Sequence, residues 1–136
     1  MKAVVAVLCI SMTVVMGQEV LKRWEELHHI CQADPATFVD ESIFEGVKKG
    51  DPVELPPNFG AHVYCMTGNL NIQDANGNFN KDITAGLIGQ VVSDPAKVSR
   101  VVDECAVVKG NREESAVQFL QCLDRNEVDI GQSETY

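Results

Sequence analysis

Five cysteines in a chain of 136 residues constrain the fold more than any other feature of this sequence. In a short secreted protein, cysteines pair as disulfides that stabilise a small domain, whereas in a cytosolic protein they usually stay reduced or bind metal. The compartment therefore has to be established before the cysteines are interpreted, and the N-terminal segment bears on it directly.

The N-terminal segment has the layout of a secretory signal peptide. Lys2 supplies a positive start, residues 3–15 are almost wholly apolar, and Gly17 is a small residue where cleavage would fit. We therefore predict that residues 1–17 are a signal peptide and that residues 18–136 form a single domain. The apolar run is short for a bilayer span, so a membrane anchor or buried helix is the weaker alternative. We expect a secreted, extracellular protein with no stable membrane insertion.

Cleavage at this point would remove Cys9 and leave an even number of cysteines: Cys31, Cys65, Cys105 and Cys122. Four cysteines in an oxidising compartment predict two disulfides, but they allow three pairings, and the sequence alone does not choose among them. In the chain-entropy estimate, a disulfide in a domain of this size contributes about 3–4 kcal/mol to stability.

The charge balance excludes several classes of partner. The sequence holds 20 Asp and Glu against 11 Lys and Arg, for a formal net charge of −9. Nucleic acid is not an expected partner, because phosphate binding requires clustered cations. Docking on anionic lipid is excluded for the same reason.

The dominant hydrophobic period after the N-terminal segment is that of an α-helix, and no segment alternates as a strand would. We expect Phe38 and Phe44 to be buried by the second helix, and Ile83, Leu87 and Val91 to form one stripe on the fourth. The tail beyond residue 125 is short, polar and acidic. The pattern predicts an all-α fold of about six short helices, at 18–32, 36–48, 58–70, 82–92, 95–109 and 112–125.

Two interpretations of the inward-facing apolar residues stay open. The simpler one is an ordinary packed core. The other is a helical shell around an apolar pocket, because the third and fourth segments contain Gly60, Gly68, Gly86 and Gly89. Glycine costs about 1 kcal/mol relative to alanine inside a helix, so several glycines fit a shell that leaves space for a ligand.

No motif in the chain predicts catalysis, a metal or a cofactor. Aligning the loop around Gly77 with a calcium-binding loop puts Ile72 and Ile83 where carboxylates are required. His28, His29 and His62 lie in no zinc motif, and no nucleophile elbow is present. Partly exposed helix histidines are the simpler interpretation, and a pH-sensitive group near a pocket is the alternative. We therefore expect a protein that is not an enzyme.

The cysteine spacing resembles that of the insect odorant-binding proteins, the pheromone/general odorant-binding family. That family usually has six cysteines, and the four retained here correspond to its first, third, fourth and sixth. The second and fifth fall at Ala61 and Glu113. These two positions bridge each other in the family, so their joint loss is typical of its Minus-C subgroup. The loop QDANGNFN at 73–80 is also similar, and the resemblance spans nearly all of 18–125.

The resemblance implies a particular disulfide pairing and a ligand cavity. It implies Cys31–Cys65 and Cys105–Cys122 bridges in a helical shell around an apolar cavity. It also implies a non-catalytic carrier of small hydrophobic ligands, such as odorants, pheromones or similar volatiles, acting in chemosensation. A chemosensory receptor is a candidate partner, and the protein is expected to be a monomer or weak dimer. From the inward stripes, we expect the ligand to contact Trp24, Phe44, Val63, Met66, Leu87, Val91, Val101, Phe119 and Leu120.

Two other functions stay open at this point. The same fold would serve a secreted carrier of lipid-like ligands outside olfaction. A secreted interaction protein with a packed core and an acidic surface is the alternative from another class.

Overall fold

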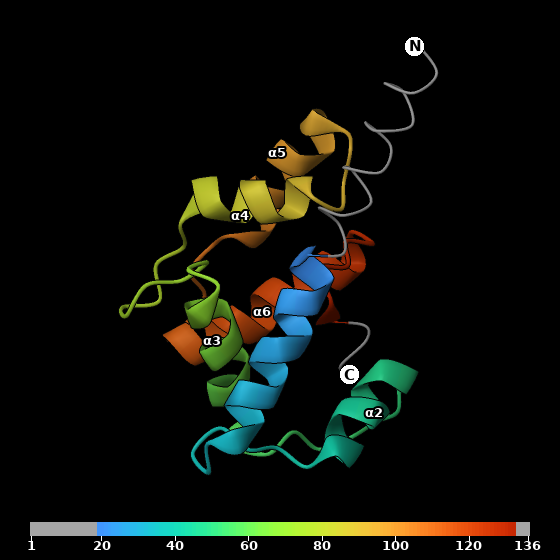
Figure 1. The fold of residues 1–136 in the computed structure, drawn as a ribbon, viewed down its shortest axis with the longest axis vertical. Helices are drawn as coiled ribbons and strands as arrows, with labels where there is room; N and C mark the ends of the chain where they lie inside the picture. The colour runs from blue at the N-terminus through green and yellow to red at the C-terminus, as the bar shows by residue number, and fades with distance from the viewer. Residues whose placement is uncertain (1–18, 133–136) are drawn as a thin grey trace, which may run out of the picture.

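The computed structural model describes residues 19–132, and the predicted signal peptide lies outside them. Over this range the fold is all-α, as predicted, and the only strand-like pairing is an isolated bridge between Gln73 and Phe79. No helix in the described part of the chain is long and apolar enough to span a bilayer. The N-terminal helix covers residues 19–33, and α2 to α6 follow as Glu41–Lys49, Phe59–Asn69, Lys81–Gly89, Pro95–Cys105 and Arg112–Arg125 (Figure 1).

Side-chain caps determine where most of these helices begin. Asp40, Asn80, Asp94 and Asn111 each accept a hydrogen bond from a backbone N–H in the first turn of the helix that follows. These are residue types that compensate the unpaired donors of a helix N-terminus. The start of each of these helices is therefore a local property of the sequence.

The second helix begins later than predicted, and one residue expected in the core is exposed. Thr37 N–H donates to the Asp34 carbonyl at 3.0 Å, closing a turn, and the cap at Asp40 then starts α2 at Glu41. The predicted start at 36 was wrong because this turn and its cap compete with an earlier helix. Phe38 lies in the connecting segment and is 51 % exposed, whereas Phe44 is buried as expected.

The buried face of α4 is rotated by one residue from the predicted stripe. Thr84 and Ile88 are buried, Ile83 is exposed, and Leu87 and Val91 are partly buried. Burying a threonine is tolerated here because its hydroxyl donates to the Asn80 carbonyl at 2.7 Å. The predicted stripe was wrong because it was built from apolar residues alone. It therefore left out Thr84, which can be buried because its hydroxyl is hydrogen-bonded within the helix.

The fourth and fifth helices also end earlier than predicted. α4 ends at Gly89 rather than 92, and α5 ends at Cys105 rather than 109. Ala106, the C-cap of α5, has φ −82° and ψ 60°, so the chain leaves the helical conformation there. Gly110, with φ +75°, lies in the connection to α6 instead of closing α5.

The core lies where the N-terminal helix crosses the pair formed by α3 and α6, while α4 and α5 pack together at one end of the molecule (Figure 1). Trp24, Met66, Phe119 and Leu123 are buried there, with 2 % or less of their surface exposed. At Gly60 on α3, an added Cβ would lie 3.0 Å from the Cβ of Glu113 on α6. The two helices are thus in close contact next to Ala61 and Glu113, the two positions where the family usually has a third bridge.

The two predicted disulfides are present. Cys31–Cys65 joins the N-terminal helix to α3, and Cys105–Cys122 joins α5 to α6. Neither bridge involves α2, which carries no cysteine. The bridges therefore fasten the core helices to one another and leave α2 held by packing and hydrogen bonds.

The segment after α6 is more buried than its composition indicates. Val128, Ile130 and Gln132 are each 2 % exposed or less. Gly131 has φ +123°, and a Cβ there would approach the Cβ of Trp24 to 2.5 Å. The expectation of a polar tail was wrong for this segment, because its alternating apolar residues pack against the N-terminal helix.

Candidate ligand-binding site

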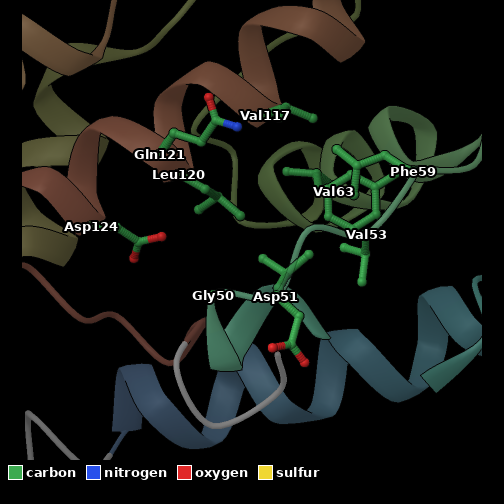
Figure 2. A pocket seen from close by; sticks show the side chains of 11 residues that line it. Gly50, Asp51, Val53, Phe59, Val63, Val117, Leu120, Gln121 and Asp124 are labelled. Carbon is green, nitrogen blue, oxygen red and sulfur yellow. The ribbon is translucent and has the colours of Figure 1, made fainter. Parts of the chain in front are cut away.

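A half-open apolar pocket lies between α2, α3, α6 and the loop that joins α2 to α3 (Figure 2). Its volume is about 240 Å³. An apolar cavity of about 150 Å³ accepts benzene, so this volume suits a ligand of roughly ten non-hydrogen atoms. The lining consists of Val47, Gly50, Asp51, Val53, Leu55, Phe59, Val63, Val117, Leu120, Gln121 and Asp124.

The pocket changes from apolar to polar along one face of α6. Val117, Leu120, Gln121 and Asp124 follow at the three- and four-residue spacing that places side chains on the same helix face. Val117 and Leu120 adjoin the apolar side chains of α3, whereas Gln121 and Asp124 lie nearer the C-terminal end of α6. From Val117 to Asp124 the helix rises about 10 Å. A ligand lying along this face would meet hydrocarbon first and a carboxylate last.

The Asp124 carboxylate is the charged group directed at the pocket. Figure 2 shows it pointing from α6 into the open space, while the Asp51 carboxylate points away from Leu120 and Val63. Asp124 accepts a hydrogen bond from Gln132 Nε2 at 3.1 Å. Partial burial raises the pKa of the Asp124 carboxyl, the bond from Gln132 opposes this change, and the nearby Asp129 adds to it.

The buried segment after α6 holds Gln132 in hydrogen-bonding contact with that carboxylate. Gln132 Nε2 also donates to the Val128 carbonyl at 2.7 Å, and Gln132 Oε1 accepts from Ile130 N–H at 2.9 Å. The side chain is 1 % exposed. A buried amide with both its oxygen and its nitrogen engaged has little freedom to rotate, so it presents a fixed donor to Asp124.

The structure brings two of the nine predicted contact residues into this pocket, Val63 and Leu120. The partly buried Leu87 and Val91 lie on and just after α4, away from the lining. The remaining five are core side chains with 2 % or less of their surface exposed: Trp24, Phe44, Met66, Val101 and Phe119.

Most of the lining was missed by sequence reasoning. Gly50, Asp51, Val53 and Leu55 belong to the loop between α2 and α3, where no helical period exists to mark an inward face. Asp124 was missed because an exposed carboxylate near the end of a helix is normally no more than a solvated charge. The available signal was its place on the same face as Val117 and Leu120.

A second groove lies between α4 and α5 and is more open. Its volume is about 490 Å³, and charged side chains, Lys81, Asp82 and Asp103, stand at its edge. Its apolar lining includes Ala85, Val98 and Val102. We take the pocket beside α6 as the candidate site because it is more enclosed, and burial of most of a ligand's surface is what gives a small molecule affinity.

Two histidines meet in the interior at one end of the core. His28 and His62 are 4 % and 1 % exposed, so the interpretation of partly exposed histidines was wrong for both, while His29 is exposed. His28 Nδ1 lies 3.3 Å from His62 Nε2. Each histidine stands three residues before a bridged cysteine, Cys31 or Cys65. The disulfide therefore brings the two imidazoles together, and that shared offset was a signal available in the sequence.

These histidines belong to a chain of hydrogen bonds that reaches the surface. His62 Nδ1 lies 2.8 Å from the Thr37 carbonyl, and His28 Nε2 lies 3.2 Å from Glu41 Oε1. Because a carbonyl only accepts, a neutral His62 carries its hydrogen on Nδ1 and has Nε2 as an acceptor. A neutral His28 ring has one N–H, so it donates either to His62 or to Glu41. Burial, with the neighbouring His28, lowers the pKa of His62 to about 4, although the bond to Thr37 and the charge of Glu41 oppose this.

The residues 19–132 contain no cluster of three or more histidine, cysteine or acidic side chains arranged to hold a metal ion. The candidate site itself offers apolar carbons, an amide and carboxylates to a ligand.

Residues 16–126 match the model of the PBP/GOBP family. Searches of curated proteins and of solved structures gave no significant match. The match covers the six helices that the structure describes and both disulfides.

Proposed function

Because this chain belongs to the PBP/GOBP family, whose members are binding carriers, we propose that it is a secreted carrier of small hydrophobic ligands. The ligand site is the pocket between α2, α3 and α6. Its proposed role is transport of odorants, pheromones or similar volatiles in chemosensation. The proposal includes a cleaved signal peptide at 1–17, a single domain over 18–136 and the Minus-C type of the family.

The observation that carries this proposal is the half-open apolar pocket in the wall of a disulfide-bonded shell. Phe59, Val63 and Leu120 present hydrocarbon to a space of about 240 Å³. Transfer of apolar surface from water yields about 25 cal/mol per Å², so burying roughly 200 Å² of a volatile supplies about 5 kcal/mol before the costs of ordering. Such a driving force suits reversible carriage.

The arrangement of the disulfides supports an adaptable pocket. One bridge joins the N-terminal helix to α3, and the other joins α5 to α6. The pocket wall that faces α3 and α6 is formed by α2 and the loop at 50–58, which carry no bridge. A wall without a covalent tie can shift to fit ligands of different shape at lower cost than the bridged core. We infer that α2 moves when the pocket fills.

The nine side chains predicted from the helical stripes divide into different roles. Five of them are buried in the core and lie outside the pocket lining. Val63 and Leu120 are the two we assign to direct ligand contact. A chemosensory receptor as partner, and a monomer or weak dimer as the working state, complete the proposal.

A fluorescent apolar probe tests the carrier function. We expect saturable uptake by the folded protein with a micromolar dissociation constant, and displacement by small volatiles. Val117→Trp should fill the pocket and weaken binding at least about tenfold, because the added ring occupies the ligand volume. Val108→Trp is the matched control, since Val108 is 49 % exposed and outside the pocket lining.

The outcomes separate the candidate functions. No probe uptake by folded protein would favour an acidic interaction protein with a packed core. Equal loss of binding in both tryptophan variants would move the site elsewhere. A carrier of lipid-like ligands outside olfaction would bind the probe equally well, and the tissue that secretes the protein distinguishes that alternative.

A further inference from the structure

We propose that this pocket selects ligands whose polar head donates hydrogen bonds, above all a protonated amine, which Asp124 would hold while carboxylic acids are rejected. The inference rests on the proposed carrier function and adds the chemical class of the ligand. It is carried by the side chains at the polar end of the pocket.

The polar lining of the pocket is acidic and contains no cation. Its polar side chains are Asp51, Gln121 and Asp124. The nearest cations along the chain, Lys48, Lys49 and Arg125, are exposed and do not line the pocket. A carboxylate ligand would therefore meet like charge with the neutral Gln121 amide as its only side-chain donor and no cation to compensate it, which opposes binding. A donor head would meet acceptors.

The surroundings of Asp124 strengthen its preference for a cation. It lies in the last turn of α6, where the helix dipole places partial negative charge and favours a positive group. Asp129 adds a second carboxylate nearby and helps to raise the pKa of Asp124. An ammonium group at this position would relieve both repulsions. Gln132 already donates to the carboxylate, so Asp124 is oriented before the ligand arrives.

The length of the pocket limits the rest of the ligand. The apolar stretch beside Val117, Leu120 and Val63 precedes Asp124 along about 10 Å of α6. With a volume of about 240 Å³, the pocket fits a chain of roughly eight carbons whose head reaches the carboxylate. Longer chains would extend through the open side into solvent.

The test compares three ligands that share one hydrocarbon chain: octan-1-amine, octan-1-ol and octanoate at pH 7.5. Binding is measured by displacement of the apolar probe and by calorimetry on the secreted, oxidised protein. We expect the amine to bind about tenfold more tightly than the alcohol, since hydrogen bonds to charged groups are the stronger ones, and octanoate to bind most weakly.

Two variants locate the effect. Asp124→Asn should bring the amine to within about twofold of the alcohol and improve octanoate, while the alcohol itself changes little. Asp103→Asn removes the same charge from the far groove, where Asp103 makes an exposed ion pair with Lys81 at 3.5 Å, and should leave the order unchanged. Thermal unfolding of both variants checks that each is folded.

The results discriminate between the two proposals. If all three ligands bind equally, or octanoate binds best, the head-group inference is overturned and the carrier function stands. If the probe and all three ligands fail to bind the wild-type protein, the carrier function itself is wrong. The wild-type series decides the question even if Asp124→Asn does not fold.

Discussion

Acidification should destabilise the folded protein through His62, and the structure gives both the sign and the size of the effect. His62 is 1 % exposed, and its pKa falls from 6.5 to about 4 on folding, chiefly because burial disfavours the imidazolium. Above pH 6.5 the imidazole is neutral in both states, so it contributes no pH dependence. Below pH 6.5 the unfolded chain takes up a proton that the folded protein does not, and stability is lost as the pH falls towards 4.

The magnitude follows from the difference between the two pKa values. One pKa unit corresponds to about 1.4 kcal/mol, so the full loss between pH 6.5 and pH 4 is about 3 kcal/mol. At pH 5 the loss is about 2 kcal/mol, which corresponds to a fall of about 8 °C in Tm for a domain of this size. Glu41, whose pKa is lowered, acts in a different window: burial raises that pKa, but bonds from Gln32 and His28 outweigh it, so its stabilising contribution is lost only below pH 4.5.

Urea unfolding of the oxidised protein at several pH values between 7.5 and 5 measures this slope. His62→Asn should lower the free energy of unfolding at pH 7.5, because the contact with His28 is lost. It should also lose about 2 kcal/mol less of that free energy than the wild-type protein between pH 7.5 and pH 5. His29→Asn is the matched control, since His29 is exposed beside His28 and its loss should leave the slope intact. The reasoning is refuted if wild-type protein and His62→Asn lose stability equally on acidification.

Three further outcomes are expected. Ala61→Cys with Glu113→Cys should close a loop of about 50 residues and, once oxidised, add up to about 4 kcal/mol of stability; a confirmed bond with no gain would contradict the alignment of these positions. Gly131→Ala should cost at least about 2 kcal/mol, because its Cβ would collide with Trp24 at a φ of +123°. Gly50→Ala is the control, since Gly50 also has a positive φ but faces open space, and it should cost about 1 kcal/mol. Equal losses of stability in the two variants would argue against packing of the segment after α6 on Trp24. Reduction of both native disulfides should lower the free energy of unfolding by about 4 kcal/mol or more, seen as a lower urea midpoint, and an unchanged midpoint would show that the bridges do not restrict the unfolded chain.

The sequence determined the parts of this protein that depend on neighbours along the chain. The helical class follows from hydrophobic spacing, and the predicted bounds of α6, 112–125, agree with the observed ones. The structure shows why the start is local: the Asn111 side chain caps it. The disulfide pairing was inferred through the spacing of four cysteines, which resembles that of a known family. Before α2, the turn closed by Thr37 and the cap at Asp40 compete with an earlier helix start. The helix therefore begins later than the sequence pattern predicted.

Tertiary structure alone decided which inward residues form core and which form a pocket. Phe119 and Leu120 are neighbours on α6 and almost equally buried, yet Leu120 lines the pocket and Phe119 does not. Helical period places both side chains inward, but the space between helices depends on how they are set against each other and on a loop with no period. The same holds for His28 and His62, which are 34 residues apart and meet because a disulfide fixes their helices. Distances between elements, and therefore the pocket, the buried imidazoles and the carboxylate of Asp124, come from packing that no local pattern specifies.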